Sequence, residues 1–156
     1  MTEITIPKGK KVYFASDNHL GAPTMEASKP REKKFVAWLD TIKEDAAAIF
    51  LLGDLFDFWM EYKTVVPKGF TRTLGKLAEL SDAGIPIYYF VGNHDLWMNG
   101  YFEEELNIPV FHKPQQYKIN GASFFGLQIF HFNKIWSPKG LTSDFVGRKF
   151  RKTCQF

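Results

Sequence analysis

The sequence predicts a mixed α/β domain built on a parallel β-sheet. Three apolar runs, residues 12–15, 46–52 and 85–91, are rich in residues that suit buried strands. Between them lie two amphipathic stretches, residues 31–45 and 70–83. Because strand alternates with helix, we expect right-handed crossovers and a parallel sheet with helices on its faces.

The two amphipathic stretches have the spacing of helices. Apolar residues recur three or four positions apart in both, as one face of a helix requires. They are Phe35, Trp38, Leu39 and Ile42 in the first stretch, and Leu74, Leu77 and Leu80 in the second. Gly84, followed by Ile85 and Pro86, then ends the second helix and begins the third strand.

Further along the chain the pattern changes to a hairpin. Residues 100–106 predict a short helix and residues 108–111 a fourth short strand. Two apolar segments then flank Asn120-Gly121, a pair that favours a type I′ turn because both residues need positive φ. We therefore expect a second, antiparallel layer to begin here.

The last part of the chain shows no strong element. Pro138, Gly140 and Gly147 interrupt any periodicity, and the segment ends in a basic run. We interpret residues 1–156 as one domain whose tail, 126–156, has diverged.

Composition limits the classes of function. With 156 residues, 45% of them hydrophobic, the chain can bury one core. A net charge of +3 is too mild for a nucleic-acid partner. The single Cys154 and the absence of a signal sequence predict a cytoplasmic protein. The longest apolar run, residues 46–52, is far shorter than the roughly 20 residues that span a bilayer, so we expect any membrane contact to be peripheral.

A polar segment follows each of the three predicted strands. Because parallel strands end at one edge of a sheet, these segments are expected to meet there. Carboxylates, imidazoles and a carboxamide gathered in one place predict a site for divalent metal ions. The segments are Ser16-Asp17-Asn18-His19, Gly53-Asp54-Leu55-Phe56-Asp57 and Gly92-Asn93-His94-Asp95.

Each segment offers particular ligands. Asp17 and His19, two positions apart, would project to one side of an extended strand end and bind one ion. The carboxylate of Asp54 can bridge two cations, and Gly53 would let the backbone approach a ligand. Asn93 offers a neutral carbonyl oxygen.

The third segment adds an imidazole. His94 can act as a base or a cation near physiological pH, and Asp95 can orient an imidazole. Ordinary turns and helix caps also use Asp, Asn and Gly, which is the structural alternative for each segment taken alone. Acids and imidazoles at three successive strand ends favour metal binding, because independent turns do not require them.

These segments resemble the signature of the calcineurin-like metallophosphoesterases. Its pattern runs Asp-x-His, Gly-Asp-x-x-Asp, Gly-Asn-His-Asp or Glu, a lone His, and Gly-His-x-His. Within that superfamily, residues 14–21 and 53–59 look like the UDP-2,3-diacylglucosamine hydrolases of lipid A biosynthesis, in particular those of Bacteroidetes. The resemblance covers residues 11–121 and implies an αββα sandwich, here its parallel-sheet half and the start of the second sheet.

The resemblance implies a two-metal site. Asp17 and His19 would hold the first ion, Asp54 would bridge both, and Asn93 would hold the second. Carboxylate oxygens and imidazoles suit Mn²⁺, the expected ion, and also Fe²⁺ or Zn²⁺. Two such ions about 3.5–4 Å apart lower the pKa of a bridging water and screen charge during in-line attack on phosphorus.

It also implies catalytic and substrate-binding residues. His94 would contact the phosphate, supported by Asp57 or Asp95, and Asn93 and Trp59 would help to bind the substrate. The reaction implied is hydrolysis of UDP-2,3-diacylglucosamine, a nucleotide-linked lipid, to UMP and 2,3-diacylglucosamine 1-phosphate. The acyl chains need an apolar surface, and the aromatic and Met residues near the motifs either begin one or belong to the core. They are Phe56, Phe58, Trp59, Trp97 and Met98.

The histidines of the later family motifs have no counterpart. The next expected ligand falls near Gln128, and His131 comes three residues late, so on a strand it would point to the opposite face. His112 has no evident partner, and Gly-His-x-His is absent. We therefore expect weak binding of the second ion. The chain is either a truncated or frameshifted product, which is the favoured interpretation, or a genuinely shortened homologue.

Two other functions fit the same motifs. One is a different calcineurin-like phosphoesterase, acting on a nucleotide or a phosphodiester. The other is a catalytically inert module that binds metal or a partner, as the missing histidines suggest.

Overall fold

The computed structural model describes residues 2–126, which form three helices and seven strands. In chain order these are β1 (Thr2–Ile4), β2 (Lys11–Ala15), α1 (Met25–Ile42), β3 (Ala46–Leu52), α2 (Thr71–Asp82), β4 (Ile87–Phe90), α3 (Tyr101–Leu106), β5 (Val110–Phe111), β6 (Gln115–Ile119) and β7 (Ala122–Gly126). The predicted alternation of strand and helix is confirmed over the first half of the chain.

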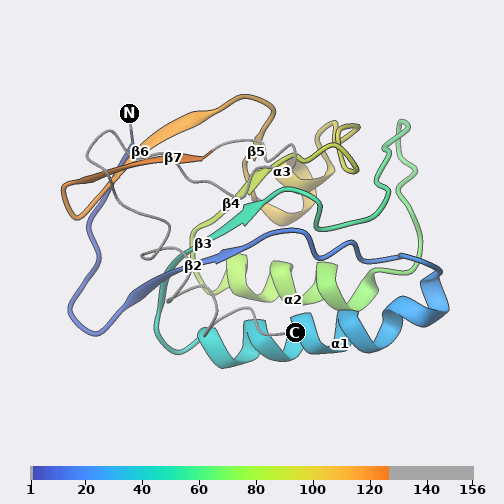
Figure 1. The fold of residues 1–156 in the computed structure, drawn as a ribbon, viewed down its shortest axis with the longest axis horizontal. Helices are drawn as coiled ribbons and strands as arrows, with labels where there is room; N and C mark the ends of the chain where they lie inside the picture. The colour runs from blue at the N-terminus through green and yellow to red at the C-terminus, as the bar shows by residue number, and fades with distance from the viewer. Residues whose placement is uncertain (1, 127–156) are drawn as a thin grey trace.

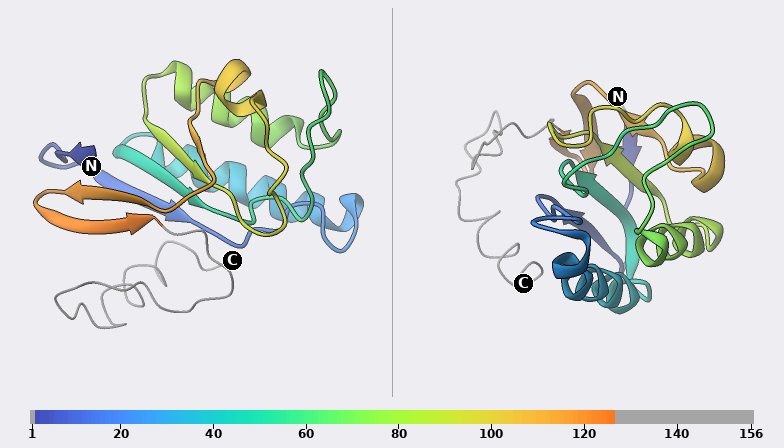
Figure 2. Two further views of the ribbon diagram at one scale, coloured as in Figure 1. Left: turned by 90° about the horizontal axis from the view of Figure 1, so that it is seen from above. Right: turned by 90° about the vertical axis from the view of Figure 1, so that its right-hand side faces the viewer.

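The elements form three layers (Figure 1). The central layer is a parallel sheet with the strand order β2-β3-β4-β5. Helices α1, α2 and α3 cover one face of this sheet, and a second sheet, β1-β6-β7, lies on the other, as the two turned views in Figure 2 also show. These are three of the four layers of an αββα sandwich.

Strand β3 shows why the apolar runs are continuous. Ile49 and Leu51 face the helices, whereas Phe50 and Leu52 face the second sheet. Both faces of the strand are buried, so no alternation of polar and apolar residues is needed. The aromatic residues between the sheets gather around Phe50, whose ring stacks on that of Phe14 with centroids 5.1 Å apart.

Three features differ from the prediction. The helices lie on one face of the sheet, because the strand order follows the sequence and each right-handed crossover returns on the same side. Helix α1 begins at Met25, before residue 31, with the Thr24 hydroxyl accepting the N–H of Ala27 (3.1 Å) and Pro30 inside the helix. The second sheet is mixed, because β1 pairs in parallel with β6.

The hairpin prediction is confirmed. Strands β6 and β7 pair antiparallel, and Asn120 and Gly121 have φ of 46° and 82°. Residues 127–156, with Gln128, His131 and nearly all of the predicted tail, lie outside the described residues. Among residues 2–126, none of the helices combines the length and apolar character that crossing a bilayer requires.

Candidate metal centre

The loops that follow β2, β3 and β4 are joined through their backbones. The N–H of Asp17 donates to the carbonyl of Gly53 (3.2 Å), and the N–H of His19 donates to that of Asp54 (2.9 Å). On the other side, the N–H of Trp59 donates to the carbonyl of His94 (3.3 Å). The three polar segments predicted from the sequence therefore meet at the carboxyl edge of the parallel sheet.

Two glycines allow the loops to approach this closely. A Cβ on Gly53, whose φ is +87°, would lie 2.8 Å from the Cα of Gly92. A Cβ on Gly92 would lie 2.1 Å from Oδ1 of Asp54. The expectation that Gly53 makes room for a ligand was wrong, because the backbone of the neighbouring loop fills that space.

Three of the predicted ligands have left-handed backbone conformations. The φ angles of Asp17, His19 and Asp54 are 54°, 43° and 52°, values that residues with a side chain rarely adopt. The prediction of an extended strand end at Asp17 and His19 was therefore wrong, since β2 already ends at Ala15. Strained backbone of this kind is concentrated at functional sites.

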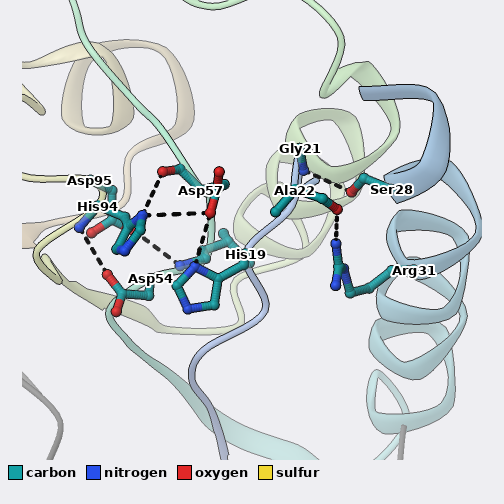
Figure 3. A network of polar contacts seen from close by, with 10 residues as sticks. His19, Gly21, Ala22, Ser28, Arg31, Asp54, Asp57, His94 and Asp95 are labelled. Atoms are coloured by element: carbon teal, nitrogen blue, oxygen red, sulfur yellow. Dashed lines mark hydrogen bonds and ion pairs between the residues drawn. The ribbon is translucent and has the colours of Figure 1, made fainter. Parts of the chain in front are cut away.

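The side chains of these residues form two overlapping clusters. Ligand atoms of Asp17, His19 and Asp54 all lie within 4.8 Å of one another, and so do those of His19, Asp57 and His94. His19 belongs to both clusters. Figure 3 shows Asp57 between the two imidazoles, whose ring centroids are 4.7 Å apart.

Among the described residues, the carboxylates of the centre have no lysine or arginine beside them. Within residues 2–126, no Lys or Arg forms an ion pair with Asp17, Asp54 or Asp57, although Asp54 is only 4% exposed. A buried carboxylate such as that of Asp54 needs a compensating charge, whereas Asp17 is exposed and Asp57 is partly exposed. Carboxylate oxygens with imidazole nitrogens are ligands that Mn²⁺, Fe²⁺ and Zn²⁺ accept, so the residues present fit a divalent metal ion.

His94 is held in one orientation. Its Nδ1 lies 2.7 Å from the carbonyl oxygen of Asp57, and because a carbonyl only accepts, Nδ1 carries the hydrogen. The same nitrogen lies 3.5 Å from Oδ1 of Asp57, which is 3.3 Å from Nδ1 of His19. The backbone N–H of His94 donates to Oδ1 of Asp54 (3.0 Å). Nε2 is then the nitrogen that can interact with a ligand.

Comparison with known proteins gives the family. Residues 10–154 match the calcineurin-like phosphoesterases. The chain belongs to this family, whose members are hydrolases. The resemblance expected from the motifs is thereby confirmed.

Two relatives that match the chain carry one name. The chain is 46% identical over 141 residues to the UDP-2,3-diacylglucosamine hydrolase of Porphyromonas gingivalis, covering 90% of this chain and 53% of that protein. It is 27% identical over 146 residues to the enzyme of the same name from a Shewanella species, covering 94% and 55%. The chain spans about half the length of the curated relatives it matches.

In this calcineurin-like phosphoesterase, Asp95 lies beneath the centre. It is fully buried and accepts hydrogen bonds from the N–H of Leu55 (3.1 Å), the hydroxyl of Tyr89 (2.6 Å) and the N–H of Gly92. Burial raises the pKa of the Asp95 carboxyl. A catalytic role does not suit this position, because Asp95 binds backbone and Tyr89, while Asp57 contacts His94.

Trp59 is also placed differently from the prediction. Its ring is fully buried against Phe56 (4.5 Å between centroids) and Phe102 (5.4 Å), and its Nε1 donates to Glu61 (2.9 Å). Of the apolar residues near the motifs, Phe56, Trp59 and Met98 belong to the core, whereas Phe58 and Trp97 are about half exposed. The side chain of Trp59 therefore belongs to the core, and its part in substrate binding stays a prediction.

The two remaining candidates are Asn93 and His112. Asn93, directly after Gly92, is partly exposed at the same sheet edge, whereas the exposed His112 follows β5 and joins neither cluster. The sequence analysis missed Tyr89, the partner of Asp95. The available signal was a tyrosine at a core-facing strand position, where a buried hydroxyl needs a partner.

Proposed function

We propose that this chain uses two divalent metal ions to hydrolyse the pyrophosphate of UDP-2,3-diacylglucosamine, giving UMP and 2,3-diacylglucosamine 1-phosphate. The observation that carries the proposal is the gathering of Asp17, His19 and Asp54 beside the pair formed by Asp57 and His94. The choice of substrate is supported by the 46% identity to the Porphyromonas gingivalis enzyme of that name.

Asp17, His19 and Asp54, which share one cluster, are proposed as metal ligands. Asp17 and His19 would hold one ion and Asp54 would contribute to both. Asn93, assigned from the resemblance of the motifs, would serve the second, with Mn²⁺ as the proposed metal. When bound, such ions supply an activated water and positive charge against the phosphate oxygens.

His94 and Asp57 supply the protein's own part of the chemistry. Since Nδ1 of His94 donates to the carbonyl of Asp57, Nε2 is the ring nitrogen that would contact a phosphate oxygen. The carboxylate of Asp57, near both imidazoles, helps to hold their orientation. Asn93 helps to bind the substrate.

The setting of the reaction is part of the proposal. A substrate that joins a nucleotide to two acyl chains belongs at the boundary between water and a membrane. We place the protein in the cytoplasm, in peripheral contact with the inner membrane.

The test is Mn²⁺-dependent release of UMP from UDP-2,3-diacylglucosamine by the purified chain. Asp54→Asn should lower the rate about 100-fold or more, because a ligand of both ions loses its charge. Asp82→Asn, at an exposed position ending α2, is the matched control and should leave the rate unchanged.

Two results would contradict the proposal. If UMP is not released but another phosphodiester or nucleotide from a panel is hydrolysed, the chain is a different phosphoesterase. If calorimetry shows one weak Mn²⁺ site and no substrate is turned over, the chain is an inert metal-binding module.

A further inference from the structure

The large apolar side chains that are exposed within residues 2–126 gather at one end of the molecule. They come from the start of α1, from the loop between β3 and α2, and from the loop after β4. We call them the apolar rim: Met25 (40% exposed), Phe58 (52%), Met60 (47%), Tyr62 (64%), Val65 (62%), Leu96 (37%) and Trp97 (53%).

Direct contacts join the segments that carry the apolar rim. Met60 and Trp97 pair as an isolated parallel bridge, and the rings of Phe58 and Trp97 lie 5.9 Å apart. At the other end of the loop, a Cβ on Gly69 would lie 2.3 Å from Cε of Met25, so Met25 packs against this loop. The rim is therefore one surface and not scattered side chains.

The centre of the rim projects from the body of the protein. Tyr62 and Val65 exchange two backbone hydrogen bonds of 3.0 and 2.9 Å, which close a narrow turn. Figures 1 and 2 show this loop, between β3 and α2, extending away from the layered core. The apolar side chains of this loop can therefore enter a non-aqueous layer without rearrangement of the sheet or the helices.

The exposed charges of this loop are positive and favour contact with an anionic surface. Lys63 and Lys68 are exposed, and the ammonium of Lys63 lies 5.5 Å from the centroid of the Tyr62 ring. The acids of the same loop are engaged inward: Glu61 accepts from Nε1 of Trp59 and the N–H of Asn99, and Asp57 contacts the two histidines of the metal centre. Exposed aromatic and aliphatic side chains beside lysines are typical of surfaces that enter an anionic lipid interface.

The rim also adjoins the metal centre. A shallow hollow lined by Met25, Phe58, Lys68 and Phe70 is bordered by Asp57, which contacts both imidazoles. We propose that the apolar rim inserts into the surface of an anionic phospholipid bilayer and so holds the metal centre at the lipid boundary. The proposal deepens the proposed function, on which its choice of a lipid partner rests.

The test is flotation of the full chain with vesicles of phosphatidylethanolamine and phosphatidylglycerol. The wild-type chain should float with the vesicles, and Met60→Ser/Tyr62→Ser/Val65→Ser should reduce the bound fraction at least about tenfold. Lys63→Ser/Lys68→Ser should weaken binding to the vesicles and make the remaining binding less sensitive to salt. The control Lys8→Ser/Lys34→Ser, which removes two exposed lysines that lie neither in the loop between β3 and α2 nor in the loop after β4, should bind as the wild type does.

Three outcomes would overturn the proposal: no flotation of the wild-type chain, equal flotation of the triple serine variant, or a dimer in light scattering that the triple variant abolishes, since the rim would then be a contact between copies. Hydrolysis of a water-soluble phosphodiester, measured without vesicles, separates this from the proposed function. Flotation without hydrolysis supports the docking surface alone, and hydrolysis without flotation supports the catalytic proposal alone.

Discussion

The two ends of the parallel strands differ in how closely their loops pack. Before β2 and β4, a Cβ on Gly9 or Gly84 would meet nothing within 4 Å. After β3 and β4, a Cβ on Gly53 or Gly92 would collide with backbone or with Asp54. The turns at the amino ends of the strands are loosely packed, whereas the loops at the carboxyl ends pack closely around acidic side chains.

The charges at the two ends differ in the same way. At the amino end, Lys11 binds Asp45 (2.5 Å), as does the hydroxyl of Tyr13 (2.6 Å), and Lys11 lowers the pKa of Asp45. At the carboxyl end, within the described residues, Asp17 and Asp54 have no lysine or arginine partner. At the amino end, the charges of Lys11 and Asp45 neutralise each other. At the carboxyl end, a bound cation would neutralise the acidic side chains.

The largest effect is expected for Gly92→Ala. The new Cβ cannot fit 2.1 Å from Oδ1 of Asp54, so the loops must separate. We expect a loss of about 2–4 kcal/mol in the free energy of unfolding, measured by urea denaturation, together with loss of Mn²⁺ binding in calorimetry.

Gly75→Ala is the matched control. Gly75 lies in α2, is exposed, and has nothing within 4 Å of its Cβ position. This change should stabilise the protein by about 0.5–1 kcal/mol because alanine favours helix. Equal effects of the two substitutions would remove the contrast between the packed and the open positions.

Tyr89→Phe should have an intermediate effect. It removes the hydroxyl that donates to the buried Asp95 (2.6 Å), and a buried acceptor that loses a donor costs about 1–3 kcal/mol of stability. Because Asp95 also holds the N–H groups of Leu55 and Gly92, the Mn²⁺ affinity should fall as well.

Tyr88→Phe is the control for this prediction. Tyr88 lies on the same strand but packs with Phe50 on the face toward the second sheet. Its substitution should leave Mn²⁺ affinity unchanged. A similar loss of affinity in both variants would show that Tyr89 acts only through general stability.

The smallest effect is expected at the amino end, for Asp45→Asn. The fold lowers the pKa of Asp45 below its ordinary 3.8, so its stabilising contribution is present above that pH and is lost as the pH falls below it. Exposed pairs contribute little, and we expect Tm to fall by a few degrees at most near neutral pH. The difference from wild type should vanish in strong acid, and Mn²⁺ binding should not change.

Much of the fold follows from local patterns. The apolar run 46–52 and the helical spacing of residues 70–83 each matched an element of the structure, because burial on both faces or on one stripe leaves a direct trace in the sequence. The start of α1 did not, since Thr24 rather than an apolar residue defines it. Strand β1 has no pattern of its own and exists only through pairing with β6.

The sequence predicted which acids and imidazoles gather at the sheet edge but not their geometry. That Asp17, His19 and Asp54 are left-handed depends on hydrogen bonds between loops distant in sequence. For the same reason, the different contacts of Asp57 and Asp95 could not be predicted from the sequence.

The pairing of β1 with β6 has a consequence for the order of folding. The N–H of Ile6 donates to Oδ1 of Asn120 across 114 positions (2.8 Å), whereas β2, α1, β3, α2 and β4 follow one another directly along the chain. Closing so long a loop is entropically unfavourable, and contacts of this range form late. During synthesis, β1 can therefore pair with β6 only after residues 115–119 have left the ribosome, when the helices and the parallel sheet can already have assembled.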